Sequence, residues 1–471
     1  MNGQRKNTFW LCCSSVNMRQ AASTEFFQPN FNILRQLRLK RRQQRALAAH
    51  KVRCKDNAKD LEELDTFHRA IRPYLCLARI FGMMPLANVM SPHAKQVKFH
   101  LRSTGMCFSA LFLLLGGIKT MRIAAKIYQG GINSRSLVNL VFYIMGMIIC
   151  LNFISFARCW HRLIVPWNEI DIIMLFPPYA PTKISLRVKL FITALKLIIL
   201  INEFHFFSIV EHGLYYASAY TNYHMHMLHC QPNVTEILFS GYMKREFADI
   251  FEMLPYNPIF IFYAFFLTGT FSFISNFLDT FIILISMALA QRFKQFSQRV
   301  LKLKNRQVPD ALWHELRHHH ILLCELMDLV DTNMSSIVLF SCLNNIYFIC
   351  NRLLTIFTKL RYPVNYAFFW FSLLFLLGRT CAVFLYASRI HEFSVLPLEV
   401  LYMVPSDNWT EEVQRFTHQI NNQFIALSGY RLYYLTRKSF FGMMSTLVYY
   451  EFMLLQLDAK DQKGDLPALC A

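Results

Sequence analysis

The stretch IFIFYAFFLTGTFSFISNFLDTFIILISMAL, from Ile259 to Leu289, predicts a membrane-spanning helix. Asp279 is its single charged residue, and a helix needs about 20 mostly apolar residues to cross a bilayer. Working outward along the chain, six more stretches meet this criterion: Phe99–Ile123, Leu137–Phe156, Leu190–Ala217, Ile337–Phe357, Tyr366–Ser388 and Ser439–Leu457. The sequence therefore predicts an all-α membrane protein with seven transmembrane helices.

The composition agrees with a helical protein in lipid. Of the 471 residues, 54% are hydrophobic and 17% are charged, and the mean hydropathy is +0.28. Soluble proteins carry about 25% charged residues, which argues against a secreted disulfide module, a disordered chain or an ordinary cytosolic enzyme. The net charge of +20 could indicate nucleic-acid binding, but the basic residues lie between the apolar stretches. Membrane topology explains them better, so no nucleic-acid partner is expected.

The distribution of basic residues predicts the orientation of the chain in the membrane. With a cytosolic N-terminus, the inner segments hold 35 Lys and Arg residues and the outer segments hold nine. Because cytosolic loops are enriched in these residues, we expect the N-terminus inside and the C-terminus outside. This orientation is opposite to that of a G-protein-coupled receptor. It places the sequon Asn233-Val234-Thr235 in the second outer loop, where Asn233 could be glycosylated.

This topology predicts six segments along the chain. They are a cytosolic basic tail (1–60), an interfacial or re-entrant helix (61–96), a six-helix ligand-binding bundle (97–390), a cytosolic anchor helix (391–438), the seventh helix (439–457) and an extracellular tail (458–471). Within the anchor segment, Val413, Phe416, Ile420 and Phe424 recur at helical spacing. We expect residues 409–428 to form an amphipathic helix that follows a cap region at Asp407 and Asn408, stops at Gly429 and packs against a helical cytosolic layer.

Two of the 13 cysteines, Cys230 and Cys470, face outward on this topology. The extracellular side is oxidising, so the two could form a disulfide. The alternative is that both are free thiols.

One enzyme-like motif occurs in the sequence. His314-Glu315-Leu316-Arg317-His318 matches the H-E-x-x-H signature of zinc peptidases. It lies in a histidine-rich patch of a predicted cytosolic helix, and no third ligand follows at a suitable spacing. We therefore interpret it as a solvated helix, and expect no metal, no cofactor and no enzymatic activity.

Polar residues inside the spans are the candidates for ligand binding, because such residues usually face protein or water. The predicted ligand-binding residues lie in the middle or outer half of their spans: Glu211, His212, Asn344, Asn345, Tyr347 and Trp370. Carboxylates and amides can hydrogen-bond sugar hydroxyls, and aromatic rings can stack on a pyranose. A structural role within the bundle, or lipid contact for the aromatic rings, is the alternative. Asp279 and Arg379 are expected to pair or cap towards the cytosolic side.

Several segments resemble insect gustatory receptors. The last span reads YYEFMLLQL, in which Tyr450 and Gln456 match the family's closing Thr-Tyr and Gln-Phe motif, while Tyr449 and Leu457 depart from it. The segments EHGLYYASAY, MDLVDTNMSS, FSCLNNIYFIC and FFWFSLLFLLGRT resemble the sugar-receptor branch, closest to receptors for simple sugars such as glucose. The likeness begins near residue 64 and continues to the C-terminus.

The resemblance implies a sugar-gated, non-selective cation channel in the plasma membrane of gustatory sensory neurons. It implies four subunits, as a homotetramer or a heteromer, around one pore that passes monovalent and divalent cations. Extracellular mono- or disaccharides would bind in each subunit, and the seventh helix would line the pore with Gly442, Ser445, Tyr449, Phe452 and Gln456. Two alternatives remain: a subunit that needs a different sugar-receptor partner, and a membrane transporter.

Overall fold

The computed structural model describes residues 66–131, 134–175, 178–179, 209–230, 238–252, 255–354 and 360–458. Leu64–Ala471 forms one compact unit, and the other unit, Met1–Glu63, lies outside the described residues. The predicted basic tail and most of the third predicted span also lie outside them.

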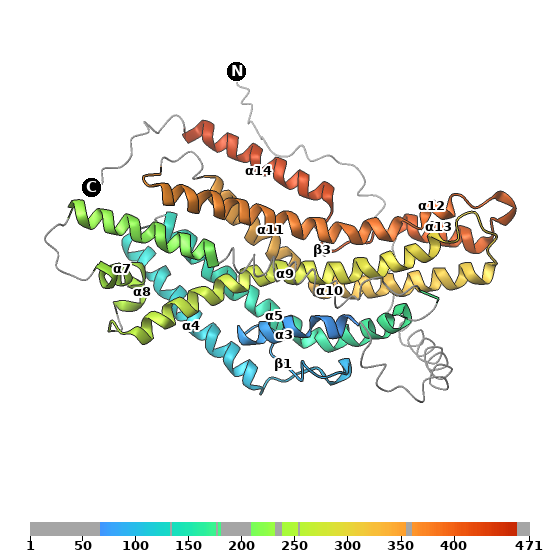
Figure 1. Cartoon of the computed structure of the whole chain (residues 1–471), viewed down its shortest axis with the longest axis horizontal. Coiled ribbons are helices and arrows are strands. Elements are labelled where there is room, and N and C mark those ends of the chain that lie inside the picture. The colour runs from blue at the N-terminus through green and yellow to red at the C-terminus, as the bar shows by residue number, and fades with distance from the viewer. Residues whose placement is uncertain are drawn as a thin grey trace, which may run out of the picture. The chain divides into compact units, whose positions relative to one another are not determined.

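The described part of the chain is almost entirely helical, which confirms the predicted fold class (Figure 1). Its helices are α3 (Phe67–Ile80), α4 (Thr104–Gly130), α5 (Ser134–Leu175), a helix over 209–230, α7 (Leu238–Glu246), α8 (Ala248–Phe251), α9 (Pro258–Leu301), α10 (Asp310–Leu353), α11 (Pro363–Val395), α12 (Leu398–Leu401), α13 (Glu411–Asn422) and α14 (Arg437–Asp458). Short 3-10 helices occur at Ala94–Gln96 and Ser406–Asn408. Strand β1 (Leu86–Ala87) pairs antiparallel with β2 (Lys98–Phe99), and β3 (Ser428–Gly429) pairs antiparallel with β4 (Tyr433–Tyr434).

Five of these helices, α4, α5, α9, α10 and α11, are long and apolar enough to cross a membrane. They contain the second, fourth and sixth predicted spans and most of the first and fifth; residues 355–357 of the fifth lie outside the described residues. The first span was predicted to begin at Phe99, but α4 begins at Thr104. The reason is local, because Phe99 pairs with Leu86 in the β1–β2 hairpin and the Ser103 side chain caps α4. The seventh predicted span lies within α14, and the end of the third lies in the 209–230 helix.

Side-chain caps and prolines set where several helices begin. Ser103 Oγ accepts a hydrogen bond from Met106 N at 3.2 Å, and Asn257 Oδ1 accepts one from Ile259 N at 3.0 Å. Each bond satisfies a backbone N–H that has no partner within its own helix. Pro258 and Pro363 occupy the first turns of α9 and α11, where proline costs no hydrogen bond.

Helix α9 is the centre of the bundle and packs against α5, α10 and α11. The apolar 18-residue part of α9 is 94% buried, whereas the corresponding part of α4 is 28% buried. The stretch Ile259–Leu289 therefore belongs to a core helix that is surrounded by protein. Helix α4 leaves most of its apolar surface for lipid.

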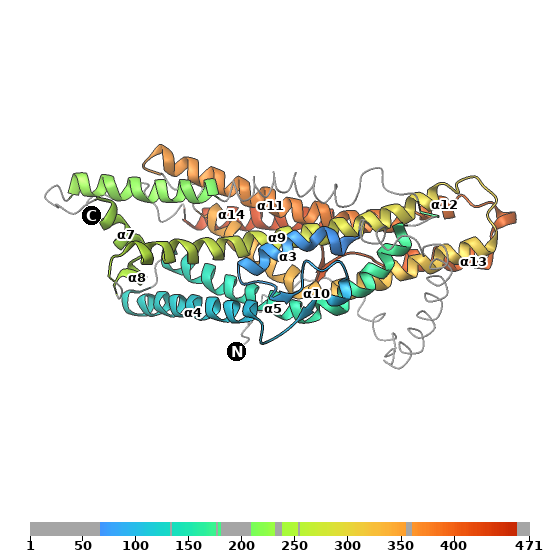
Figure 2. The same ribbon diagram turned by 60° about the horizontal axis from the view of Figure 1, so that its bottom comes forward.

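Helices α9 and α10 each have 44 residues, about 66 Å at 1.5 Å per residue. A hydrocarbon core of about 30 Å cannot contain that length, so both helices continue beyond the membrane. At one end of the bundle α13 packs against α10 and α12 packs against α9, while α7 and α8 lie at the opposite end (Figure 1 and Figure 2). Arg317 Nε on α10 donates a hydrogen bond to Glu412 Oε2 on α13 at 2.8 Å.

The amphipathic helix differs in its bounds from the prediction. Helix α13 begins after Thr410, whose side chain accepts a hydrogen bond from Val413 N, whereas the predicted cap region was Asp407 and Asn408. Val413, Phe416 and Ile420 are buried as predicted. The helix ends at Asn422, so Phe424 lies beyond it and is 53% exposed.

Candidate ligand cavity

A cavity of about 1090 Å³ lies at the end of the bundle that carries α7 and α8. Its walls come from α4, α5, the 209–230 helix, the α7–α8 segment, α9, α10 and α11. This volume is slightly above the usual range for small-molecule sites, which is about 300–1,000 Å³. Many polar groups line the cavity, among them Lys119, Asn139, Glu211, His212, Asn222, Glu246, Asp249, Ser275, Asn276, Asn344, Arg352, Ser372 and Arg379.

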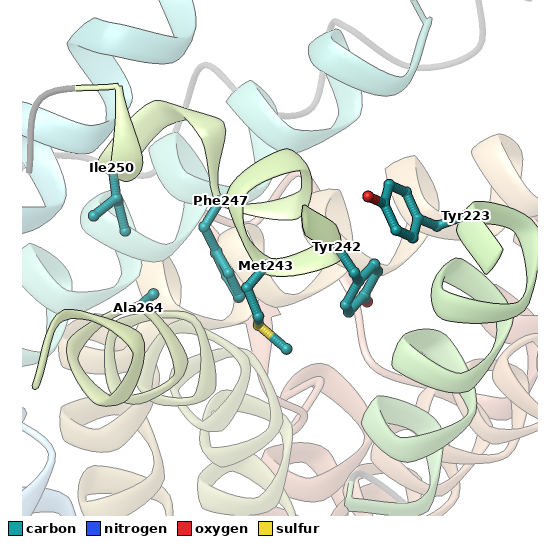
Figure 3. Close-up of a cluster of buried hydrophobic side chains, with 6 residues drawn as sticks. All are labelled: Tyr223, Tyr242, Met243, Phe247, Ile250 and Ala264. Atoms are coloured by element: carbon teal, nitrogen blue, oxygen red, sulfur yellow. The ribbon is translucent and has the colours of Figure 1, made fainter. Parts of the chain in front are cut away.

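Aromatic side chains of a buried cluster line one side of the cavity; Figure 3 shows the cluster. Tyr223, Tyr242 and Phe247 line the cavity and belong to a buried cluster with Met243, Ile250 and Ala264. The Tyr223 and Tyr242 ring centroids are 5.9 Å apart. Such rings present both apolar faces and hydroxyl groups, which suits an amphipathic ligand.

Ion pairs join α4 to the α7–α8 segment at the exposed end of the cavity. Lys119 Nζ lies 3.5 Å from Asp249 Oδ2, and Lys126 Nζ lies 2.7 Å from Glu252 Oε1. Lys119 is buried and also lies over the Tyr143 ring, 4.7 Å from its centroid. These contacts position the α7–α8 segment across the cavity.

Hydrogen bonds orient the polar groups on the middle of the wall. His212 Nε2 lies 2.8 Å from Ser272 Oγ, and Ser372 Oγ donates to Glu211 Oε1. These bonds connect the 209–230 helix with α9 and α11. They hold carboxylate, imidazole and hydroxyl groups at the cavity surface in fixed positions.

The deep end of the cavity carries two unsatisfied polar atoms. Asn344 Oδ1 and Ser275 Oγ are buried and have no hydrogen-bond partner among the described residues. Both residues line the cavity. A buried polar atom without a partner is costly, so these atoms are suited to a ligand that brings hydroxyl groups.

A buried polar network lies directly beyond the deep end; it consists of Asn276, Asp279, Ser341, Asn345 and Arg379. Arg379 Nη2 donates to Asn345 Oδ1 at 2.8 Å, and Asn345 Nδ2 donates to Asp279 Oδ2 at 3.0 Å. Asp279 and Arg379 pair, as expected from the sequence. Of the five members, Asn276 and Arg379 reach the cavity surface.

The structure brings together three of the six predicted ligand-binding residues: Glu211, His212 and Asn344 all line the cavity. Asn345 belongs to the buried polar network instead. Tyr347 and Trp370 are not part of the cavity lining, and Trp370 is 47% exposed on the outside of the bundle. Sequence reasoning missed Lys119 and Ser275. Lys119 could have been recognised, because a lysine within an apolar helix usually faces protein or water. Nothing in the sequence distinguished Ser275 from other serines.

The exposed side of α14 carries the predicted pore-lining residues whose side chains are described: Gly442, Ser445, Tyr449 and Phe452. Tyr449 is 65% exposed in the single chain. On the opposite side, Leu447 packs against Ile349 and Leu376. The side chain of Gln456 lies outside the described residues.

Three further predictions concern cysteines, a glycan and a metal motif. Cys230 is disulfide-bonded, and the other eight cysteines of the described segments are free. Cys470 and Asn233 lie outside the described residues, so the Cys230–Cys470 bond and the glycan stay predictions. In the H-E-x-x-H motif, Glu315 Oε1 is 2.9 Å from Arg299 Nη2 and His314 Nδ1 is 3.3 Å from Glu412 Oε2. These side chains therefore connect α10 with α9 and with α13.

Known proteins resemble this chain over most of its length. The family model described as trehalose receptor matches residues 34–470. The Drosophila melanogaster protein named gustatory receptor for sugar taste 61a is 51% identical over 92% of this chain and 98% of its own length. Gustatory receptor for sugar taste 64a from the same organism is 37% identical, over 87% of this chain and 88% of its own length.

Among solved structures, the insect olfactory receptor OR5 from Machilis hrabei aligns with a TM-score of 0.49 and 15% identity, over 82% of this chain and 97% of its own. The family model and the identity to the two Drosophila receptors identify the chain as a receptor rather than an enzyme. This multi-pass membrane protein belongs to the trehalose receptor family, among the insect gustatory receptors for sugar taste.

Proposed function

We propose that the chain is a sugar-gated, non-selective cation channel in the plasma membrane of gustatory sensory neurons. Extracellular sugar binds in the cavity of each subunit. Four subunits, identical or mixed with other sugar-receptor chains, surround one pore lined by α14. The names of the Drosophila relatives, which refer to sugar taste, support a sugar as the ligand.

The observation that carries the proposal is the chemistry of the deep end of the cavity. Asn344 Oδ1 accepts hydrogen bonds, and Ser275 Oγ can accept or donate one. Both atoms are buried and without partners in the described part of the chain. A sugar ring presents hydroxyl groups that both accept and donate, and its apolar face can lie against the aromatic wall. A purely apolar ligand would leave both atoms unsatisfied.

One side chain supports a direct connection between the cavity and the pore helix. Leu376 on α11 lines the cavity and also belongs to the buried cluster with Leu447 of α14. Ile349 on α10 completes that cluster. Helices α10 and α11 therefore form the cavity on one side and hold α14 on the other. A ligand that shifts either helix will move the contact surface of α14.

The test is expression of the full chain alone in a cell line, with recording of currents while a panel of mono- and disaccharides is applied. Sugar-evoked cation current is the expected result. Current that appears only on co-expression of a second sugar-receptor subunit would support the obligate-partner alternative. Uptake of radiolabelled sugar without a channel current would indicate a transporter and contradict the proposal.

A further inference from the structure

The long segment between Asp65 and Glu169 contains no aspartate or glutamate. Its first part, residues 66–104, consists of α3, the β1–β2 hairpin and the beginning of α4. Four exposed cations lie there: Arg79, Lys95, Lys98 and Arg102. None of the four forms an ion pair with a carboxylate of the described residues. We call these four residues the basic surface.

Exposed apolar side chains lie within the same segment. Ile80 is 65% exposed, Met90 is 66% exposed and Leu101 is 63% exposed. In a protein surrounded by water, three such side chains next to unpaired cations would be unfavourable. At a membrane interface, apolar groups enter the lipid while Lys and Arg side chains stay at the headgroups.

The basic surface is continuous with the lipid-facing side of α4. Leu111, Leu114, Ile118 and Met121 recur at three-to-four spacing on α4, and all are exposed. This apolar stripe extends towards the start of the helix at Thr104, and Arg102 comes immediately before it. Figure 1 shows the β1–β2 hairpin next to the beginning of α4. The cations therefore lie at the boundary where the hydrocarbon region ends.

Several contacts hold the basic surface in a fixed position against the bundle. A Cβ added at Gly82 would meet Phe108 and Ser109 of α4 at 3.6 Å, and one at Gly105 would meet Arg79 Nε at 3.4 Å. His161 Nδ1 on α5 lies 3.0 Å from Val97 O of the hairpin. The cations are thus presented by a packed structure and not by a free loop.

We propose that the basic surface binds the headgroups of anionic phospholipids. The predicted orientation places it at the cytosolic leaflet, which is the anionic one. Charge complementarity favours a phosphate or carboxylate group, and the exposed apolar residues favour an attached acyl chain. A lipid of the surrounding bilayer satisfies both requirements. The acidic run DLEELD, Asp60 to Asp65, is the competing intramolecular partner.

The test is a lipid titration of the detergent-purified full chain, followed by native mass spectrometry. The dissociation constant is measured for dioleoylphosphatidylserine and for dioleoylphosphatidylcholine. The test variant is K95Q/K98Q/R102Q. The matched control is K302Q/K304Q/R306Q, which removes three exposed cations after the end of α9. A charge-conserving variant, K95R/K98R/R102K, checks that the hairpin still folds.

Each cation near an anionic surface contributes about fivefold in affinity. The test variant should therefore bind phosphatidylserine at least tenfold more weakly, with phosphatidylcholine binding unchanged. The control and the charge-conserving variant should behave like wild type. Equal losses of phosphatidylserine affinity in the test variant and the control would overturn the proposal, because they would indicate a general effect of net charge.

Two other outcomes would also overturn it. One is a test variant that keeps the wild-type preference for phosphatidylserine. The other is a wild-type chain that shows no preference for phosphatidylserine, together with a D60N/E62Q/E63Q/D65N variant that does. That result would identify the acidic run as the occupant of the basic surface.

Discussion

Arg379 Nε lies 2.6 Å from Asp279 Oδ2, with both side chains almost completely buried between α11 and α9. Arg379 also reaches the deep end of the ligand cavity, and Asp279 accepts hydrogen bonds from Ser341 and Asn345 on α10. The pair therefore joins three helices at the point where the cavity ends. Two of these helices, α10 and α11, also contact α14.

Removing one partner of this pair should be strongly destabilising. Asp279→Asn or Arg379→Gln leaves an uncompensated charge in the bundle, at a cost of about 3–5 kcal/mol. The double variant Asp279→Leu/Arg379→Leu should be more stable than either single variant, because no buried charge remains. Thermal unfolding of the purified protein measures both effects. Single variants that unfold at the wild-type temperature would contradict a buried ion pair.

Asn344→Ala and Ser275→Ala should reduce sugar sensitivity. Loss of one buried hydrogen bond to the ligand costs about 1–3 kcal/mol, which is roughly a 5- to 150-fold higher half-maximal concentration. Trp370→Leu is the matched control, since Trp370 lies outside the cavity lining. Dose–response currents at equal surface expression are the measurement. Wild-type sensitivity in both cavity variants would remove these residues from the binding site.

Gly116→Ala should destabilise the contact between α4 and α9. A Cβ at Gly116 would lie 2.6 Å from Phe271 Cζ, whereas a Cβ at Gly117 has no neighbour within 4 Å. Phe271 is fully buried, so overpacking should cost about 1–3 kcal/mol. Gly117→Ala should be neutral or slightly stabilising, because alanine favours a helix. Phe271→Leu in the Gly116→Ala background should restore part of the lost unfolding temperature. Equal effects of the two glycine substitutions would refute the contact.

His68 should make the folded protein less stable in acid. It lies on α3, outside the candidate membrane-spanning helices, and its side chain is buried with Nε2 3.1 Å from Ser91 O. Burial is the main cause that lowers the pKa of His68 from 6.5 to about 4. The unfolded chain therefore binds a proton first as the pH falls. The contribution of neutral, buried His68 to the free energy of unfolding is complete above pH 6.5. It is lost as the pH falls from there to about 4.

Protonation of His68 should lower the free energy of unfolding by roughly 3 kcal/mol between pH 6.5 and about 4. His68→Gln keeps a donor for Ser91 O but does not titrate, so its unfolding temperature should depend less on pH. His100→Gln, at an exposed position, is the control and should retain the wild-type dependence. Parallel pH curves for wild type and His68→Gln would contradict the assignment.

Gln456→Glu should increase divalent permeability if α14 lines the pore. By seven-residue spacing Gln456 shares a side with Gly442 and Tyr449, so four copies would place four carboxylates around the ion path. Glu451→Gln is the control, because Glu451 is buried on the side of α14 away from Tyr449. Reversal potentials under calcium and sodium gradients measure the effect. An unchanged calcium permeability in Gln456→Glu would place the pore elsewhere.

Hydrophobic length alone determined five of the membrane helices, because a run of about 20 apolar residues has no stable place except a bilayer or a large core. Local chemistry also determined the burial of Val413, Phe416 and Ile420 in α13. The bounds of α13 were less accessible to sequence reasoning, since Asp407 and Thr410 are both good capping residues. The start of α4 depended on the β1–β2 pairing and on the Ser103 cap, because Phe99 is apolar enough for a span but pairs with Leu86 instead.

The tertiary structure alone decided which polar residues form the cavity. Asn344 and Asn345 are neighbours in sequence, yet one lines the cavity and the other belongs to the buried polar network. Successive residues of a helix point about 100° apart, so its rotation within the bundle decides their roles. A membrane helix can be apolar both towards lipid and towards protein, and its sequence then gives no amphipathic signal of that rotation. The rotation of α10 is set instead by the packing of α9, α10 and α11 against one another.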